Sequence, residues 1–169
     1  MQGFTLIEVL VVVSLAAVLL ALAAPQFGNF VRSMRLSTSM SELGSDLLLA
    51  RSESIRRNAR VLVCPRASAT SSACAATVAA STWMNGWLVC HDLDADGACD
   101  AGTATDPNPI RVRSQPPSPL SLAGPDATVT FFPMGNASGA ATFTMSAAGT
   151  TSTRSVTVAP AGGLTSSKT

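Results

Sequence analysis

The chain of 169 residues has few aromatic and few charged residues: no tyrosine, two tryptophans, one histidine, and 12% Asp, Glu, Lys and Arg. Its net charge of +1 gives no overall field that would attract nucleic acid or another polyanion. No phosphate-binding glycine loop is present, and no serine, cysteine or acid pair has a base at catalytic spacing, because His91 lies outside any motif. We therefore expect no enzyme activity.

Cysteine is also scarce, and all four cysteines lie in the second part of the chain. The sequence has no CxxC pair and only one histidine, which argues against a zinc site. An even number of thiols behind an export-type apolar start predicts two disulfides in an oxidising compartment. Four cysteines allow three pairings. We favour Cys64 with Cys74 and Cys90 with Cys99, because each bond would close a short loop that lacks a core of its own.

Long apolar runs are absent except at the N-terminus, where residues 4–24 are interrupted only by Thr5, Glu8 and Ser14. As a helix this run would be about 30 Å long, enough to span a bilayer. A cleaved secretory signal is the alternative, but such signals begin with basic residues and have a shorter apolar centre. We therefore predict a retained membrane helix. A lone carboxylate at membrane depth costs about 3 kcal/mol or more, so Glu8 requires an explanation.

The remainder of the chain divides into a helical and a β-rich part. Residues 25–58 repeat apolar side chains at helical spacing and predict an amphipathic helix that continues the apolar one. Short β runs follow at 60–64, 86–91, 109–113, 127–132, 141–146 and 154–159. We predict an α+β fold in which the amphipathic helix packs on an antiparallel sheet within a head at 59–160. The tail at 161–169 is expected to be flexible.

An acidic loop follows the second β run. Asp92, Asp94, Asp96 and Asp100 match the first nine positions of an EF-hand-like calcium loop, with glycine at the sixth position. The twelfth position, however, is Thr103 where that loop has glutamate, and no flanking helices are predicted. We favour a solvated acidic hairpin loop, and a weak calcium site is the alternative.

Three arginines lie at or just beyond the end of the predicted helix. Arg56, Arg57 and Arg60 could contact a DNA backbone. Cations also stabilise a helix C-terminus, and no aromatic residues are interleaved to stack on bases. We favour a solvated helix end over DNA binding.

The start Gly-Phe-Thr-Leu-Ile-Glu at residues 3–8 resembles the class III signal of type IV pilins and of type II secretion pseudopilins. The stretches at 49–65, 83–102, 110–113 and 129–145 resemble the GspH/FimT family of minor pilins and pseudopilins. The resemblance covers most of the chain. It implies a type IV pilin-like fold whose long N-terminal helix packs on an antiparallel β-sheet head.

The resemblance also implies how the chain is processed and what it binds. Residues 1–3 would be a leader that prepilin peptidase cuts between Gly3 and Phe4, and the new amine of Phe4 would be methylated. Glu8 would pair with the amino-terminal charge of a neighbouring subunit in the filament. Before assembly the chain would be a single-pass inner-membrane protein with its head in the periplasm, and afterwards part of a pilus or pseudopilus. Its partners would be other major and minor pilins or pseudopilins.

The function implied is that of a minor type IV pilin that primes or joins pilus assembly, for pilus biogenesis, twitching motility or DNA uptake. One alternative is the H pseudopilin of a type II secretion system, and another is a DNA-binding minor pilin for natural transformation. Two features depart from the family. The leader lacks basic residues, while Arg32 and Arg35 follow the apolar helix. The tail also lacks the Gly-Arg-x-Arg ending that is associated with DNA binding in competence-linked members.

Overall fold

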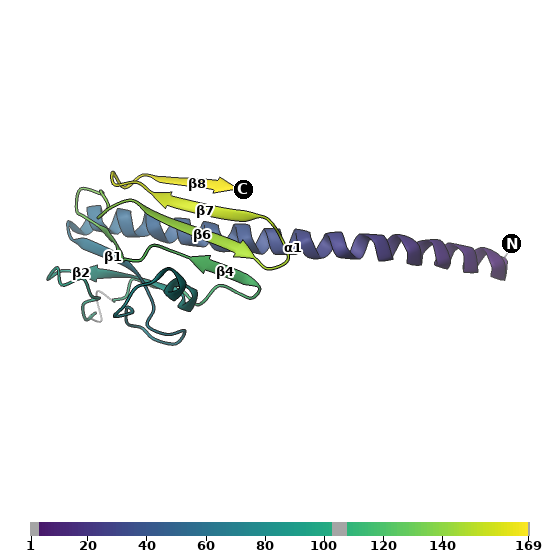
Figure 1. Ribbon diagram of the computed structural model, residues 1–169, viewed down its shortest axis with the longest axis horizontal. Coiled ribbons are helices and arrows are strands. Elements are labelled where there is room, and N and C mark those ends of the chain that lie inside the picture. Colours follow the sequence, from purple (N-terminus) through teal and green to yellow (C-terminus); the bar gives the residue numbers. More distant parts are fainter. Residues whose placement is uncertain (1–3, 103–107, 169) are drawn as a thin grey trace.

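The computed structural model describes residues 4–102 and 108–168, without the side chains of residues 21–26. A single helix, α1 (Leu6–Arg57), extends far beyond a β-rich head that packs along its C-terminal half (Figure 1). The helix begins behind Thr5, whose side-chain oxygen accepts a hydrogen bond from the backbone N–H of Glu8. It ends at Asn58, which adopts the left-handed conformation that terminates many helices.

The head contains two four-stranded sheets. The first has the order β3-β2-β1-β5, with β1 (Arg60–Pro65), β2 (Trp87–Asp92), β3 (Arg111–Val112) and β5 (Val129–Phe131). The second has the order β4-β6-β7-β8, with β4 (Leu120–Ala123), β6 (Ala141–Ala147), β7 (Thr153–Val158) and β8 (Leu164–Lys168). A short 3₁₀ helix, η1 (Ala80–Asn85), precedes β2. All strand pairs are antiparallel, so the predicted fold class is confirmed, although the strands form two sheets where we expected one.

Two strands were not predicted. In β4 the buried Leu120 and Leu122 alternate with exposed Ser121 and Ala123, but the strand has only four residues and follows a proline-rich segment that is typical of a loop. The predicted flexible tail at 161–169 is wrong for residues 164–168, which form β8 and pair with β7. This edge strand has mostly exposed polar side chains, so no apolar alternation marks it. Its order comes from backbone hydrogen bonds, which a sequence pattern does not reveal.

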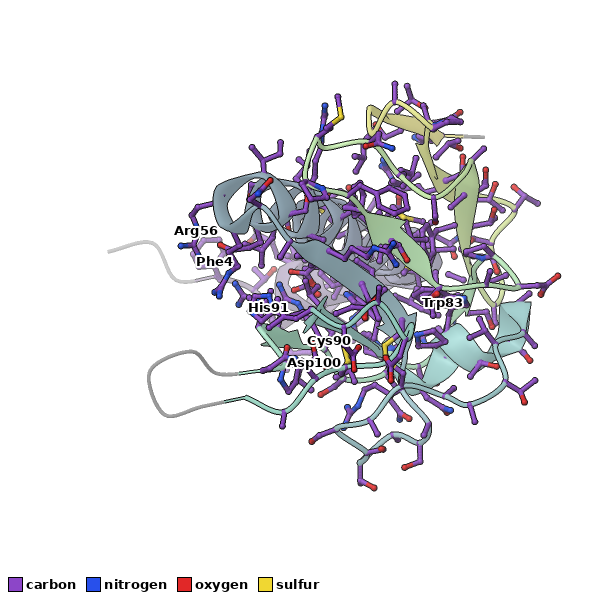
Figure 2. The ribbon with its side chains drawn as sticks, turned by 90° about the vertical axis from the view of Figure 1, so that its left-hand side faces the viewer. Phe4, Arg56, Trp83, Cys90, His91 and Asp100 are labelled. Carbon is purple, nitrogen blue, oxygen red and sulfur yellow. A yellow bond between two sulfur atoms is a disulfide. The ribbon has the colours of Figure 1, made fainter. Side chains whose placement is uncertain are left out.

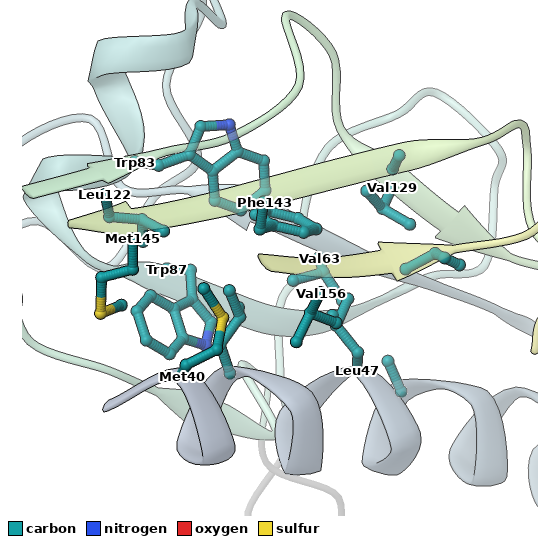
Figure 3. Packing of buried hydrophobic residues seen from close by; sticks show 14 of the residues in the cluster. Met40, Leu47, Val63, Trp83, Trp87, Leu122, Val129, Phe143, Met145 and Val156 are labelled. Carbon is teal, nitrogen blue, oxygen red and sulfur yellow. The ribbon is translucent and has the colours of Figure 1, made fainter. Parts of the chain in front are cut away.

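The core lies between the C-terminal half of α1 and the two sheets (Figure 3). The helix contributes a buried stripe of Leu36, Met40, Leu43, Leu47 and Ala50. Trp87 points from β2 toward this stripe, and Trp83 packs edge-on against Phe143 with ring centroids 4.8 Å apart. Both tryptophans are buried. Each large apolar side chain buried here stabilises the fold by about 1.5 to 3 kcal/mol.

A buried ionic network fastens β2 and the segment of β3 to the helix. Asp46 on α1 is 2% exposed. Its carboxylate accepts hydrogen bonds from Trp87 Nε1 at 3.0 Å and from Arg113 Nε at 2.7 Å, and Arg111 Nε lies 3.8 Å away. The hydrogen bond to Asp46 raises the pKa of Arg113 above its usual value, so this arginine stays charged. Sequence reasoning missed the network because its members are far apart in the chain and share no motif.

Candidate functional site: the exposed apolar helix and the surfaces of the head

The N-terminal part of α1 is apolar on all sides and contacts nothing in the head. Its large apolar side chains, of which Phe4 is 83% and Leu20 70% exposed, all lie on the surface. They are Phe4, Leu6, Ile7, Val9, Leu10, Val11, Val12, Val13, Leu15, Val18, Leu19 and Leu20. Covering twelve such side chains would be worth on the order of 20 kcal/mol. A helix that is apolar all round requires lipid or other apolar helices as its environment.

The only charged side chain in this apolar surface, among the described residues 4–20, belongs to Glu8. It lies in the first turn of α1, where a carboxylate stabilises the positive end of the helix dipole. Phe4 and Glu8 are four positions apart and line one hollow together with Val9, Val12 and Val13. Phe4 and the carboxylate of Glu8 therefore lie on the same side of the helix. Gly3, the predicted cleavage residue, lies outside the described residues.

Across the part of the chain that the structure describes, no helix is both long and apolar enough to cross a membrane. The predicted span at 4–24 includes residues 21–24, whose side chains are outside the described set. The transmembrane role of this segment stays a prediction. The same holds for the position of the leader at residues 1–3.

The predicted arginine cluster is brought together at the end of α1, but acids and aromatic rings already engage it. Arg56 Nη2 lies 2.5 Å and Arg57 Nε 2.6 Å from Glu53 Oε2. The guanidinium of Arg60 lies over the ring of Phe132, 5.5 Å from its centroid. The hydrogen bond from Arg56, assisted by that from Arg57, lowers the pKa of Glu53 below its usual value of 4.5. This arrangement matches the interpretation of a helix end, and DNA binding stays an untested prediction.

The cysteines form the two favoured disulfides, Cys64 to Cys74 and Cys90 to Cys99. Cys64 and Cys90 lie on neighbouring strands and share the outer face of the first sheet, away from the main core. There the two bonds form a small second cluster with Leu62 and Leu88. The disulfides thus supply a core for the outer loops, which have few apolar residues of their own.

The acidic loop brings three of its four predicted carboxylates together. One oxygen each from Asp92, Asp94 and Asp96 lies within 4.8 Å of the others. Asp100 is not part of this group, because its Oδ2 accepts a 2.5 Å hydrogen bond from the backbone N–H of Leu93. The backbone N–H of Asp100 donates to the carbonyl oxygen of His91 at 3.1 Å, so Asp100 closes the base of the loop next to the Cys90 to Cys99 disulfide (Figure 2). The structure thus groups three of the four predicted carboxylates, and the predicted site with Asp100 stays a prediction.

Sequence reasoning also missed a groove between α1 and the edge of the second sheet. Small helix residues, among them Ser37, Ser41 and Gly44, form one wall, and Arg154 and Lys168 on β7 and β8 lie on the other. The groove depends on the existence of β8. Because β8 was expected to be flexible tail, no sequence signal identified it.

The fold, a long helix whose C-terminal half packs on an antiparallel head, is similar to two crystal structures of the type IV minor pilin FimU from Pseudomonas aeruginosa strain PAO1. One aligns with a TM-score of 0.58 over 80% of this chain and 90% of FimU, and the other with 0.55 over 78% and 92%. Both are 20% identical to this chain, so they define the fold alone.

Comparison with protein families then shows the family to which the chain belongs. Residues 39–162 match the family of the type II transport protein GspH, and residues 1–24 match the prokaryotic N-terminal methylation motif. The chain belongs to the GspH family and carries a class III prepilin signal, which confirms the resemblance seen in the sequence. The type IV major fimbrial protein FimA of Dichelobacter nodosus is 44% identical over 43 residues, which are 25% of this chain. The match spans only about a quarter of the length of that relative, 28%.

Family and fold together identify the chain as a structural pilin subunit. Its N-terminal match to the methylation motif agrees with the predicted prepilin signal. Membrane anchoring and association with other pilins in a filament stay predictions.

Proposed function

We propose that this protein is a minor type IV pilin that joins or primes pilus assembly from the inner membrane. The observation that carries the proposal is the apolar surface of α1 with its single carboxylate. Such a surface suits lipid before assembly and a bundle of similar helices afterwards, since both environments cover apolar side chains.

The roles of the N-terminal residues follow from this proposal. Prepilin peptidase cuts between Gly3 and Phe4, and the new amine of Phe4 is methylated. The apolar segment at 4–24 then anchors the chain in the membrane, with the head in the periplasm, where the two disulfides form. In the filament, Glu8 pairs with the amino-terminal charge of a neighbouring pilin. Two opposite charges among apolar helices attract each other far more strongly than in water, and either one alone would remain uncompensated.

Complementation of a deletion strain tests the role of Glu8. We expect Glu8→Val to reduce the amount of this protein in the sheared filament fraction at least about ten-fold, while its amount in the membrane fraction stays unchanged. Glu8→Asp should retain part of the incorporation, because it keeps the charge. Glu42→Gln, which removes an exposed acid from the same helix, serves as the matched control. Normal incorporation of Glu8→Val would overturn the assembly role.

Mass spectrometry of the protein from the same membranes tests the processing step. We expect a chain that begins at Phe4 and carries one additional methyl group. A chain that retains Gly3 would contradict the assigned cleavage site.

The alternative is a pseudopilin of a type II secretion system, because the family description names a type II transport protein. Deletion of the gene separates the two. Loss of surface pili and twitching with normal secretion supports the pilus, whereas retention of exported enzymes in the periplasm with normal pili supports the secretion system.

A further inference from the structure

The loop that follows β2 and ends at Cys99 has two features that the proposed pilin function does not explain. Three carboxylates converge there, and one of them belongs to a buried residue with an unpartnered oxygen. We propose that Asp92, Asp94 and Asp96 form a calcium site that orders this loop. The proposal concerns only residues of the head and is independent of whether the chain serves a pilus or a secretion system.

Asp92 is the residue that distinguishes this loop from an ordinary acidic turn. It is the last residue of β2 and is 2% exposed. Among the described residues, its Oδ1 has no hydrogen-bond partner. A buried polar atom without a partner is costly, and a buried carboxylate more so. Within residues 4–102 and 108–168, this oxygen therefore has no compensating partner, which a positive group would supply.

Neighbouring basic side chains do not supply that group. Arg60 is the cross-strand partner of Asp92 in the register of β1 and β2. Its guanidinium nevertheless turns to the ring of Phe132, and within the described part of the chain no ion pair joins a basic side chain to Asp92. Asp94 and Asp96 add two further negative charges close to Asp92. Like charges at this spacing repel, so the cluster favours binding of a cation.

The spacing of the oxygens fits calcium. Two ligands on opposite sides of a calcium ion at about 2.4 Å lie about 4.8 Å apart, and ligands at smaller angles lie closer together. One oxygen of each of the three carboxylates lies within 4.8 Å of the others, which is compatible with shared coordination of one calcium ion. Magnesium demands near-ideal octahedral geometry at about 2.0 to 2.1 Å and gives up its water reluctantly, so three carboxylates on one loop suit calcium better. A donor set of carboxylates alone also favours calcium over zinc or copper.

The loop is held in shape before any ion arrives. The backbone N–H of Asp96 donates to Asp94 Oδ1 at 3.2 Å, and the N–H of Ala98 donates to Asp96 Oδ1 at 2.8 Å. Each bond engages one oxygen of its carboxylate, and a carboxylate has two. The Cys90 to Cys99 disulfide encloses all three aspartates in a short covalent loop. Such restraint lowers the entropy lost when the ion orders the loop.

Calcium titration of the full-length chain in neutral detergent micelles tests the site, after removal of metal with a chelator and at constant ionic strength. For a dissociation constant of about 0.3 mM, within the range of extracellular calcium modules, 10 mM calcium should raise the Tm by about 4 to 8 °C. Magnesium at the same concentration should raise it by less than half as much. No rise in Tm with calcium would overturn the proposal.

Single substitutions in the loop show whether the calcium-dependent rise in Tm originates there. Asp94→Asn and Asp96→Asn change exposed residues, so the head should still fold, and each should weaken calcium binding at least about ten-fold. Their Tm shift at 10 mM calcium should then be less than half that of the wild type. Glu42→Gln removes one negative charge elsewhere and should keep the full shift. Equal shifts in all of these proteins would mean that calcium acts at another place and would overturn the assignment.

We expect Asp92→Asn to affect the Tm differently without and with calcium. Without calcium, this variant should have a Tm equal to or above that of the wild type, because it removes an uncompensated buried charge. With calcium, its Tm should fall below that of the wild type, because it has lost a ligand. A variant that is less stable than the wild type by the same amount in both conditions would show that Asp92 is a structural residue only.

Discussion

Replacement of Asp46 by alanine should loosen the head from the helix more than any exposed substitution would. The variant leaves the Nε1–H of buried Trp87 without an acceptor, at a cost of about 1 to 3 kcal/mol. It also removes the carboxylate that accepts hydrogen bonds from Arg113 at 2.7 and 3.2 Å, and bonds to charged groups are worth about 1.5 to 3 kcal/mol. The side chain of Arg113 is 29% exposed, so water compensates part of the second loss. We expect a total loss of about 3 to 4 kcal/mol in the free energy of unfolding.

Urea unfolding of the full-length chain in detergent micelles measures this loss. Trp83 and Trp87 are both buried in the head, so their fluorescence reports its unfolding. Asp46→Asn keeps one acceptor oxygen and should lose about 2 to 3 kcal/mol. Glu42→Gln changes the charge by the same amount on an exposed part of the same helix and should stay within about 0.5 kcal/mol of the wild type. If Asp46→Ala lost less than about 1 kcal/mol, the network would not hold the head to the helix.

Two further predictions concern the ends of the fold. Gly162 has a φ of +78°, and a Cβ there would collide with the carbonyl oxygen of Gly135, so Gly162→Ala should lower the free energy of unfolding by at least about 2 kcal/mol in the same urea assay. At Gly163 a Cβ would meet open space, so Gly163→Ala should change the free energy of unfolding by less than about 1 kcal/mol. Equal effects of the two variants would refute the described turn. Glu53 has a lowered pKa in the folded state, so it stabilises the fold above pH 4.5 and loses that contribution as the pH falls through its lowered pKa. The stability difference between wild type and Glu53→Gln, measured at about pH 7 and about pH 3, should therefore be larger at pH 7, and a difference independent of pH would contradict the pairing with Arg56 and Arg57.

The two disulfides show how far local sequence reasoning reaches. Short separations between Cys64 and Cys74, and between Cys90 and Cys99, were enough to favour the correct pairing, because each loop can close without the rest of the fold. The structure adds that the two bonds pack together on one face of the first sheet. That packing depends on the register of β1 and β2, which the short β runs do not specify.

The acidic loop shows the opposite case. Four aspartates share the spacing of a calcium loop, and from spacing alone all four are equivalent candidates. In the structure Asp100 bonds to the backbone of Leu93, while Asp92 is buried at the end of a strand. Burial and hydrogen-bond partners assign different roles to residues of the same type, and neither is a property of the local sequence.

Periodicity and a contiguous motif at residues 3–8 were enough to predict the helix, most of the strands and the family. The division of the strands into two sheets, the pairing of residues 164–168 with the second sheet, and the contacts of Asp46 with Trp87 and Arg113 became visible only in the folded chain. Each of these features depends on partners that are distant in the chain. Neither the backbone pairing of a polar edge strand nor a buried ion pair leaves a repeating pattern of side chains in the sequence. The partners of both kinds of contact meet only when the chain folds.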